Sequence, residues 1–278
     1  MKLLFTDLDG TLLTDDKQIS PANYAALKKA LDGGHKVVIA TGRPLCSAKV
    51  QAQRLGLDGP GCFIIAYNGA QVYDCGAEKL VYELPLPLEA LYALTDECNR
   101  RGVYIQTYDE THVLVEPHNA GPVADRYCAP IHMGWRSVES FRRDVTAAPA
   151  KVLVIDYQGR EKTEAVEQWI HEHLSDQVEC FFSSPHYLEV VHKGMDKGRA
   201  VIAMCERLGV PVADSVAVGD EANDVSMIAA AGVGVAMANG IPAAKAAADY
   251  VTERDNNHDG MVEVVERFVL CKNSSGDE

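Results

Sequence analysis

Short apolar runs followed by helical segments recur at both ends of this 278-residue chain, and this alternation constrains its fold more than any other feature. In the first part the apolar runs lie at residues 3–6, 37–40 and 62–66, and in the last part at residues 215–218 and 233–236. Runs that are apolar at nearly every position are typical of parallel strands buried on both faces. The sequence therefore predicts an α/β fold with a parallel sheet covered by helices on both faces.

The first expected helix shows how these segments are delimited. Ser20 is placed to cap its N-terminus, and Pro21 occupies the first helical position. Tyr24, Leu27 and Leu31 recur at helical spacing, so they are expected to form the buried face. Two consecutive glycines then end the helix.

The chain changes character at residues 84–87, Leu-Pro-Leu-Pro, where two prolines predict a linker. Helices are expected beyond it at 88–101 and 161–174, and strands at 103–107, 112–115, 151–155, 178–182 and 187–191. Neighbouring strands with two main helices predict an α+β domain with an open, mainly antiparallel sheet. We therefore expect residues 1–83 and 193–278 to form the core and residues 84–192 to form an inserted domain. The tail, 273–278, is expected to be disordered.

Charge and cysteine content argue against several classes of protein. The formal net charge is −14 and no stretch concentrates Lys and Arg, so binding to nucleic acid or to an anionic membrane is not expected. The eight cysteines are scattered without Cys-x-x-Cys spacing, which favours reduced thiols in a cytoplasmic protein and argues against a zinc site. His171 and His173 are two positions apart on a helix and are interpreted as surface residues.

Two apolar stretches have the lengths to consider as targeting or membrane segments. The N-terminal run stops at Asp7, which is too early for a signal peptide. The uncharged stretch 227–244 contains Asn239, Pro242 and several glycines, so it is interpreted as a helix, a turn and a strand. A soluble protein is expected.

Two carboxylates two residues apart, Asp7 and Asp9, follow the first predicted strand directly, and Thr11 continues the pattern. Ligands in open α/β sheets bind at the carboxyl ends of strands. Asp9-Gly10 alone would be typical of a simple turn. An acidic pair that faces the same way is costly, however, unless a cation or a shared proton relieves the repulsion. These residues are therefore predicted to belong to a functional site.

Three further motifs follow in order, each at a predicted strand end or helix start. They are Ile-Ala-Thr-Gly-Arg-Pro at 39–44, Asp-Lys-Gly at 196–198 and Gly-Asp-x-x-Asn-Asp-x-x-Met at 219–227. Together with Asp-x-Asp-x-Thr at 7–11, they resemble the four motifs of the haloacid dehalogenase superfamily. The long insertion resembles the cap of the Cof-type sugar phosphatases. The resemblance spans residues 3–260 and implies a Rossmann-like, doubly wound core with an inserted α+β cap.

The resemblance implies a phosphatase that depends on magnesium. Asp7 and Asp220 would hold Mg²⁺ together with the backbone carbonyl of Asp9, since this cation prefers oxygen ligands. Asp7 is expected to attack phosphorus and form an aspartyl-phosphate. Asp9 is expected to protonate the leaving oxygen and then to deprotonate the attacking water. Asp224, one helical turn after Asp220, is expected to orient a metal-bound water or Lys197.

Other groups are expected to neutralise the equatorial oxygens of the transferring phosphoryl group. Thr41 would donate a hydroxyl, Lys197 would supply positive charge, and the amides of Leu8 and Gly42 are placed for backbone contacts. Asn223 would meet the phosphate from a helix start, where free N–H groups favour anions. The expected catalytic residues are thus Asp7, Asp9, Thr41 and Lys197.

These assignments predict a phosphoric monoester hydrolase that acts on small phosphorylated metabolites, with sugar phosphates favoured by the resemblance. A phosphomutase on the same scaffold would use Asp9 equally, so product analysis with and without a bisphosphate activator is needed to separate the two. A non-catalytic metabolite-binding regulator would be expected to lack the nucleophile or the acid, and both are present. The sequence does not determine the oligomeric state.

Discrimination between substrates is expected to come from the inserted segment, because the core residues address only phosphate and metal. Polar side chains of this segment that could contact the leaving group are Tyr104, Tyr108, His112, His118 and His132.

Overall fold

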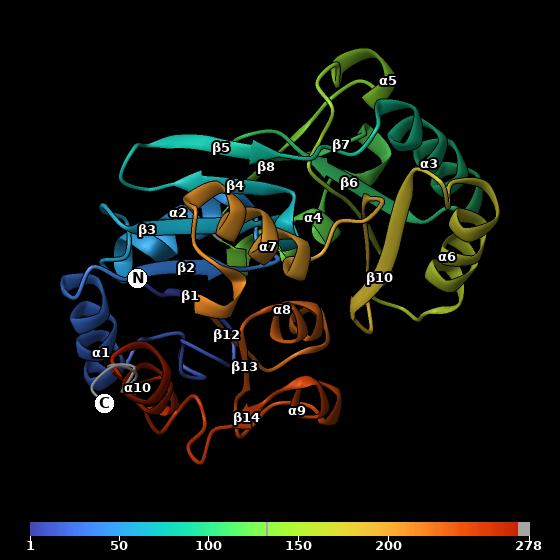
Figure 1. Ribbon diagram of the computed structural model, residues 1–278. Coiled ribbons are helices and arrows are strands. Elements are labelled where there is room, and N and C mark those ends of the chain that lie inside the picture. The colour runs from blue at the N-terminus through green and yellow to red at the C-terminus, as the bar shows by residue number, and fades with distance from the viewer. Residues whose placement is uncertain (132, 272–278) are drawn as a thin grey trace, which may run out of the picture. The chain divides into compact units, whose positions relative to one another are not determined.

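The computed structural model describes residues 1–131 and 133–271 (Figure 1). Contacts between residues divide the chain into two compact units. The first unit contains Met1–Gly42, Gln51–Leu80 and Asp196–Glu278, and the second contains Arg43–Val50 and Val81–Met195. The expectations for His132 and for the tail at 273–278 lie outside the described residues.

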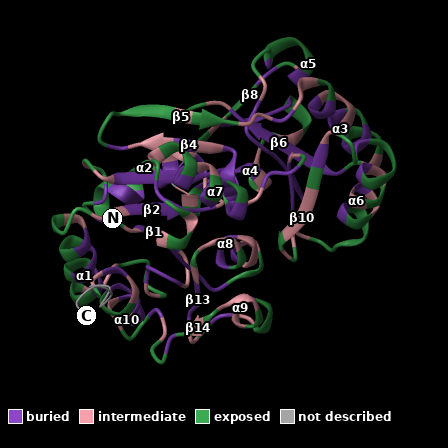
Figure 2. Ribbon diagram, in the orientation of Figure 1, coloured by how far each residue is buried: buried purple, intermediate pink, exposed green. Residues whose placement is uncertain are grey.

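The first unit is built on a sheet with the strand order β14-β13-β12-β1-β2-β3-β4-β5. The strands from β14 to β3 in this order are parallel, and β4 adds to β3 in the antiparallel direction. Every residue of β1, β3 and β12 is buried, which explains why these runs are almost entirely apolar (Figure 2). The bounds are β1 (Leu3–Thr6), β2 (Lys36–Ala40), β3 (Cys62–Ala66), β4 (Gln71–Asp74), β5 (Lys79–Glu83), β12 (Ser215–Gly219), β13 (Val233–Ala236) and β14 (Tyr250–Val251).

Helices flank this sheet on both sides. Figure 1 shows α1 and α10 on one side of strands β12 to β14, and α8 and α9 on the other. The bounds are α1 (Pro21–Asp32), α2 (Leu45–Arg54), α7 (Lys197–Leu208), α8 (Val225–Ala230), α9 (Pro242–Ala247) and α10 (Gly260–Val264). Short helical turns are η1 (Tyr67–Gly69), η3 (Val212–Asp214), η4 (Ala222–Asp224) and η5 (Val265–Val269). The predicted α/β class is confirmed.

The first helix confirms the predicted cap and confirms the expected buried face only in part, since Leu27 is fully buried. The Ser20 hydroxyl accepts a hydrogen bond from the Asn23 amide at 3.1 Å. Tyr24 was expected inside, but it is 39% exposed. The buried stripe instead consists of Asn23, Ala26, Leu27 and Ala30. This face packs against α10, and the Asn23 side chain accepts a hydrogen bond from the Val262 amide at 3.2 Å. A polar residue is therefore buried because a distant backbone donor meets it there.

The second unit holds a sheet with the strand order β10-β11-β9-β6-β7-β8. The pairs are antiparallel except β7 with β8, so the mainly antiparallel sheet is confirmed. The bounds are β6 (Tyr104–Tyr108), β7 (His112–Val115), β8 (Gly134–Ser137), β9 (Val152–Ile155), β10 (Val178–Ser184) and β11 (Tyr187–His192). The helices are α3 (Leu88–Arg101), α4 (Pro122–Ile131), α5 (Phe141–Asp144), α6 (Glu161–His173) and η2 (Pro117–Asn119).

A single hydrophobic cluster joins α3 and α6 to this sheet, with Leu94, Val154 and Ile170 fully buried in it. Among the described elements of this unit, η2, α4, β8 and α5 were not predicted. Helix α4 contains Pro130, which argues against a helix in the sequence. Strand β8 is largely exposed, so it shows no alternation of apolar residues. Among the described residues, no helix is both long enough and apolar enough to cross a membrane.

Candidate active site

The carboxyl ends of three adjacent strands of the first unit bring distant residues together. Asp7, Thr41 and Asp220 directly follow β1, β2 and β12. Strand β1 lies between the other two, and Thr6 is in register with both Ile39 and Val218. Because all three strands are parallel, the residues that follow them meet at the same edge of the sheet. The sequence motifs therefore converge as expected, although they are far apart along the chain.

Lys197 is the buried cation of this edge. It opens α7, whose N-terminus is capped by Asp196 through a hydrogen bond from the Arg199 amide at 2.8 Å. The Lys197 amine donates to Asp7 Oδ1 at 2.7 Å and to Asp224 Oδ1 at 2.6 Å. The lysine is completely buried, so these ion pairs hold it in one place at the side of the predicted nucleophile.

The protonation of these groups reflects their burial. Burial raises the pKa of Asp7 to about 7; the charge of Lys197 opposes this shift, and that of Asp224 adds to it. Burial also raises the pKa of Asp220 to about 6, although the hydrogen bond from Thr11 works in the opposite direction. Burial alone would lower the pKa of Lys197, but the charges of Asp224 and Asp7 outweigh it and raise this pKa above its ordinary value. The lysine is therefore charged at neutral pH.

Three buried carboxylates crowd around this lysine. Asp7, Asp220 and Asp224 each offer an oxygen within 4.8 Å of the others. Asp224 is fully engaged, because Oδ1 accepts from Lys197 and Oδ2 accepts from the amides of Asp220 and Glu221, both at 3.0 Å. Asp7 and Asp220 therefore share the positive charge of Lys197 with the carboxylate of Asp224. This excess of buried negative charge, with oxygen donors only, fits a hard divalent cation such as Mg²⁺.

Asp9 stands apart from this cluster. Its carboxylate pairs with the Lys17 amine at 2.8 Å, and its side chain is 37% exposed. It is not one of the three converging carboxylates. The expectation was a ligand through the backbone carbonyl, with the side chain left for proton transfer, and a half-exposed carboxylate beside the nucleophile suits that role.

Gly10 and Thr11 complete the loop after β1. Gly10 has a φ of +82°, and a Cβ there would lie 2.3 Å from Asp220 Oδ2. Only glycine therefore allows the loop to approach the carboxylate so closely. The Thr11 hydroxyl donates to Asp220 Oδ1 at 2.6 Å. Thr11 was expected only as part of the motif, without a role of its own, and the structure makes it the residue that orients Asp220.

Three of the residues predicted to bind phosphate, Thr41, Gly42 and Asn223, meet around Asn68. Asn223, in the turn η4 before α8, donates from Nδ2 to Asn68 Oδ1 at 3.0 Å. The Asn68 amide donates to the Thr41 carbonyl at 3.0 Å, and a Cβ on Gly42 would lie 3.0 Å from Asn68 Oδ1. Leu8, between the two aspartates, has a fully buried side chain.

Asn68 was not among the residues expected in the site. An Asn-Gly pair such as Asn68-Gly69 is typical of an ordinary tight turn, so the sequence gives no signal of a binding role. In the structure Tyr67 and Asn68 are both left-handed, with φ of 51° and 58°. Two consecutive left-handed residues that are not glycine are costly, and such strain gathers at functional sites. Asn68 Nδ2 is buried, and the described residues provide it with no hydrogen-bond partner, so a donor is left beside Gly42.

Comparison with known proteins agrees with this geometry. The family profile of haloacid dehalogenase-like hydrolases matches residues 4–265. The 5-amino-6-(5-phospho-D-ribitylamino)uracil phosphatase YcsE of Bacillus subtilis (strain 168) is 30% identical over 271 residues, which cover 97% of this chain and 96% of that protein.

Solved structures are similar to this chain over nearly its whole length. A haloacid dehalogenase-like hydrolase from Bacteroides thetaiotaomicron superposes with a TM-score of 0.87 and 33% identity, covering 96% of this chain and 98% of that one. The HAD subclass IIB sugar phosphatase BT4131 gives a TM-score of 0.79 and 26% identity, covering 96% and 99%. The chain belongs to the haloacid dehalogenase-like hydrolases, and it is a phosphoric monoester hydrolase of that family.

Proposed function

We propose that this enzyme is a magnesium-dependent phosphatase of small phosphorylated metabolites, above all sugar phosphates, and that it works through an aspartyl-phosphate on Asp7. The observation that carries the proposal is the buried cluster in which Lys197 contacts Asp7 at 2.7 Å while Asp220 and Asp224 lie alongside. Such a cluster supplies a nucleophile, a fixed positive charge and a place for a cation at the edge of the sheet where ligands bind.

Asp7 is the proposed nucleophile because its carboxylate is buried yet held by a charged lysine. Lys197 stabilises the ionised form of Asp7 and also offers positive charge to the incoming phosphate. Asp224 keeps Lys197 in position through its second ion pair. Mg²⁺, held by Asp7, Asp220 and the Asp9 carbonyl, would supply the positive charge that lets a dianionic ester approach a carboxylate.

Asp9 is the proposed acid and base. In the first step the Asp7 oxygen bonds to phosphorus, the bond to the leaving oxygen breaks, and Asp9 gives that oxygen a proton. In the second step Asp9 takes a proton from water, the water oxygen bonds to phosphorus, and inorganic phosphate leaves Asp7. Thr41, Asn223 and the amides of Leu8 and Gly42 are proposed to neutralise the equatorial oxygens. Lys197 is proposed to neutralise the negative charge of the same oxygens.

A chelation experiment tests the metal requirement. Turnover of a panel of phosphomonoesters is expected to vanish in excess chelator and to return with Mg²⁺, because buried carboxylates would otherwise repel the substrate. Calcium is expected to inhibit, since its longer and looser coordination misplaces nucleophile and phosphate. Phosphate release is the measurement, with circular dichroism as the control for folding. Full activity in excess chelator would contradict the proposal.

The same panel separates the phosphomutase alternative. A phosphatase releases inorganic phosphate from each substrate whether or not a sugar bisphosphate is present. A phosphomutase instead yields an isomeric sugar phosphate and is stimulated by the bisphosphate. Product analysis under both conditions therefore decides between the two. Catalysis of either kind excludes the non-catalytic regulator.

We further propose that residues 84–192 act as a cap that selects the leaving group. Within the second unit, the Tyr104 hydroxyl donates to Gln106 Oε1 at 2.8 Å and Gln106 Nε2 donates to the Tyr108 hydroxyl at 2.9 Å. The Tyr108 and Tyr127 hydroxyls lie 2.6 Å apart. This chain of polar groups could exchange partners with the hydroxyls of a sugar. It supports the cap assignment, as does the similarity to a sugar phosphatase.

Cap variants test this assignment. Tyr104→Phe, Tyr108→Phe and His112→Ala are expected to change the ranking of sugar phosphates, because each removes polar groups but leaves the phosphate-binding residues intact. Hydrolysis of a small artificial ester is expected to change much less. The measurement is kcat/KM for both substrate types. Tyr92→Phe, which removes the hydrogen bond from the Tyr92 hydroxyl to the Val145 carbonyl, serves as a control. A proportional loss on both types for every variant would show that the segment does not select the leaving group.

A further inference from the structure

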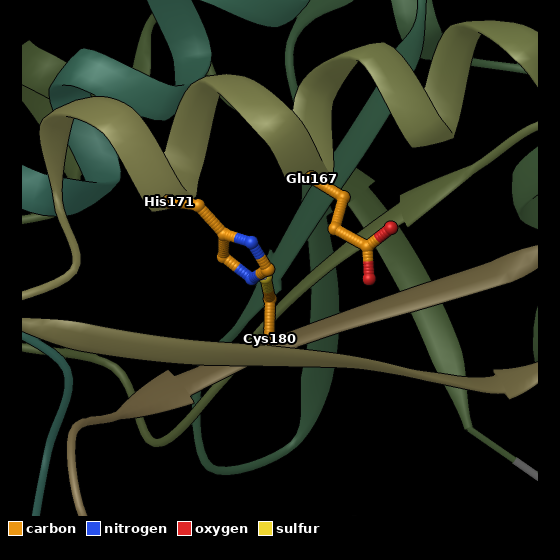
Figure 3. A group of neighbouring side chains, drawn as sticks. All are labelled: Glu167, His171 and Cys180. Atoms are coloured by element: carbon orange, nitrogen blue, oxygen red, sulfur yellow. The ribbon is translucent and has the colours of Figure 1, made fainter.

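Three side chains with metal-binding atoms converge in the second unit, in a place that the proposed reaction does not use. Glu167 and His171 lie on α6, and Cys180 lies on β10 (Figure 3). One ligand atom from each lies within 4.8 Å of the other two. We propose that Glu167, His171 and Cys180 form a binding site for Zn²⁺ or a cation of the same class.

The geometry of the sulfur and nitrogen atoms suits a tetrahedral ion. Cys180 Sγ and His171 Nε2 are 3.6 Å apart. Zinc binds sulfur at ~2.3 Å and nitrogen at ~2.0–2.1 Å, and two such bonds at a tetrahedral angle separate the ligand atoms by about 3.6 Å. The two residues therefore already stand at the spacing of one edge of a zinc tetrahedron. A carboxylate oxygen of Glu167 lies within 4.8 Å of both atoms and offers the third ligand.

The fold explains why these residues meet. Glu167 and His171 are four positions apart, so they share one face of α6. Strand β10 is at the edge of its sheet, and Cys180 packs against the hydrophobic cluster that joins α6 to the strands. Its side chain thus points toward the helix, as Figure 3 shows. His171 is exposed and the other two are half-buried, so a cation can enter and a water can fill the fourth position.

The ligand set separates this site from the carboxylates around Asp7. Thiolate and imidazole ligands select zinc and its neighbours, whereas oxygen ligands alone suit magnesium. Burial, with Glu167 and Glu179 acting in the same direction, raises the pKa of the Cys180 thiol to about 12, so the free thiol carries a proton that binding must displace.

Cobalt titration of the metal-free, full-length enzyme tests the proposal. With excess Mg²⁺ present to occupy the carboxylates around Asp7, Co²⁺ is expected to produce a thiolate-to-cobalt charge-transfer band and the visible bands of tetrahedral cobalt. Zn²⁺ is expected to abolish both by displacement. The charge-transfer band reports sulfur ligation, so it cannot arise from the aspartates.

Matched variants assign the ligands. Cys180→Ser and His171→Ala are expected to lose the charge-transfer band, and Glu167→Gln to weaken cobalt binding. His173→Ala, two positions along the same helix, and Cys271→Ser, an exposed cysteine elsewhere, are expected to keep the band. Zinc is expected to raise the unfolding temperature of the wild type but not of Cys180→Ser, which also shows whether that variant folds.

Two outcomes would overturn the inference. One is a wild-type protein that shows no charge-transfer band in the titration, which would leave the 3.6 Å contact as a plain sulfur–imidazole contact. The other is a band that persists in both Cys180→Ser and His171→Ala, which would place the cobalt on another cysteine. Neither result would bear on phosphatase activity, which is measured separately with Mg²⁺.

Discussion

Replacement of Asp7 by asparagine is expected to lower kcat by at least about 10⁴-fold, because the loss of a catalytic nucleophile has effects of that size. The amide of asparagine has the same shape as the carboxylate but cannot attack phosphorus. The fold is expected to survive, because Lys197 keeps its contact with Asp224 at 2.6 Å and one of the crowded carboxylates is gone. Phosphate release and circular dichroism measure the two effects.

Asp9→Asn is the matched comparison. It keeps the nucleophile and removes the acid and base, so the aspartyl-phosphate should form slowly and decay slowly, with a loss of ~10²–10⁴-fold. Mass spectrometry of peptides trapped during turnover identifies the phosphorylated residue. Phosphate found on a residue other than Asp7 would refute the assignment of the nucleophile.

Lys197→Met is expected to have the second large effect, on stability as well as on activity. Lys197 is completely buried between Asp7 and Asp224, at 2.7 and 2.6 Å. Removing one partner of a buried ion pair leaves uncompensated charge and costs about 3–5 kcal/mol of unfolding free energy. Activity should fall as well, because the nucleophile and the phosphate lose the same positive charge. Urea unfolding and phosphate release measure the two losses.

The loss of stability in Lys197→Met should depend on pH. Burial already holds the pKa of Asp7 at about 7 in the folded enzyme, above its ordinary value, and loss of the lysine raises it further. As pH rises from about 4 towards 7, the unfolded chain releases this proton while the folded state keeps it, so stability falls over that range. The wild type shows the same fall only up to its own Asp7 pKa of about 7, whereas the variant keeps losing stability above it. The difference in unfolding free energy between the two proteins should therefore grow from pH 7 to about pH 9, with the variant closer to the wild type at pH 7.

Two further variants separate this effect from loss of a buried lysine in general. In the Lys197→Met background, Asp224→Asn should restore part of the stability, since it removes one orphaned carboxylate, but no activity. Lys151→Met, which breaks the buried pair with Glu189 at 2.7 Å in the second unit, should destabilise comparably without impairing phosphate release from a small ester. Equal stability and activity of Lys197→Met and wild type would contradict the role of Lys197.

The order of the buried core strands could be read from the sequence because burial on both faces leaves little choice of residue. A strand such as β1, between two other strands and two helix layers, is apolar at all positions but Thr6. The cap of α1 at Ser20 was equally readable, since its hydrogen bond spans three residues. The four motifs were recognisable in order for a similar reason: each lies at a strand end or helix start.

Features that depend on contacts between distant segments were decided only by the tertiary structure. The buried face of α1 is shifted from Tyr24 to Asn23 because a donor near residue 262 meets it. Asn68 joins the site because its strained backbone places it between Thr41 and Asn223. Cys180 on a strand and His171 on a helix come into contact, although their spacing in the sequence does not match a zinc-binding motif. Capping, turn and periodicity patterns involve residues that are only a few positions apart. Side chains that act together in a site are instead brought together by tertiary packing between segments that are distant in the sequence.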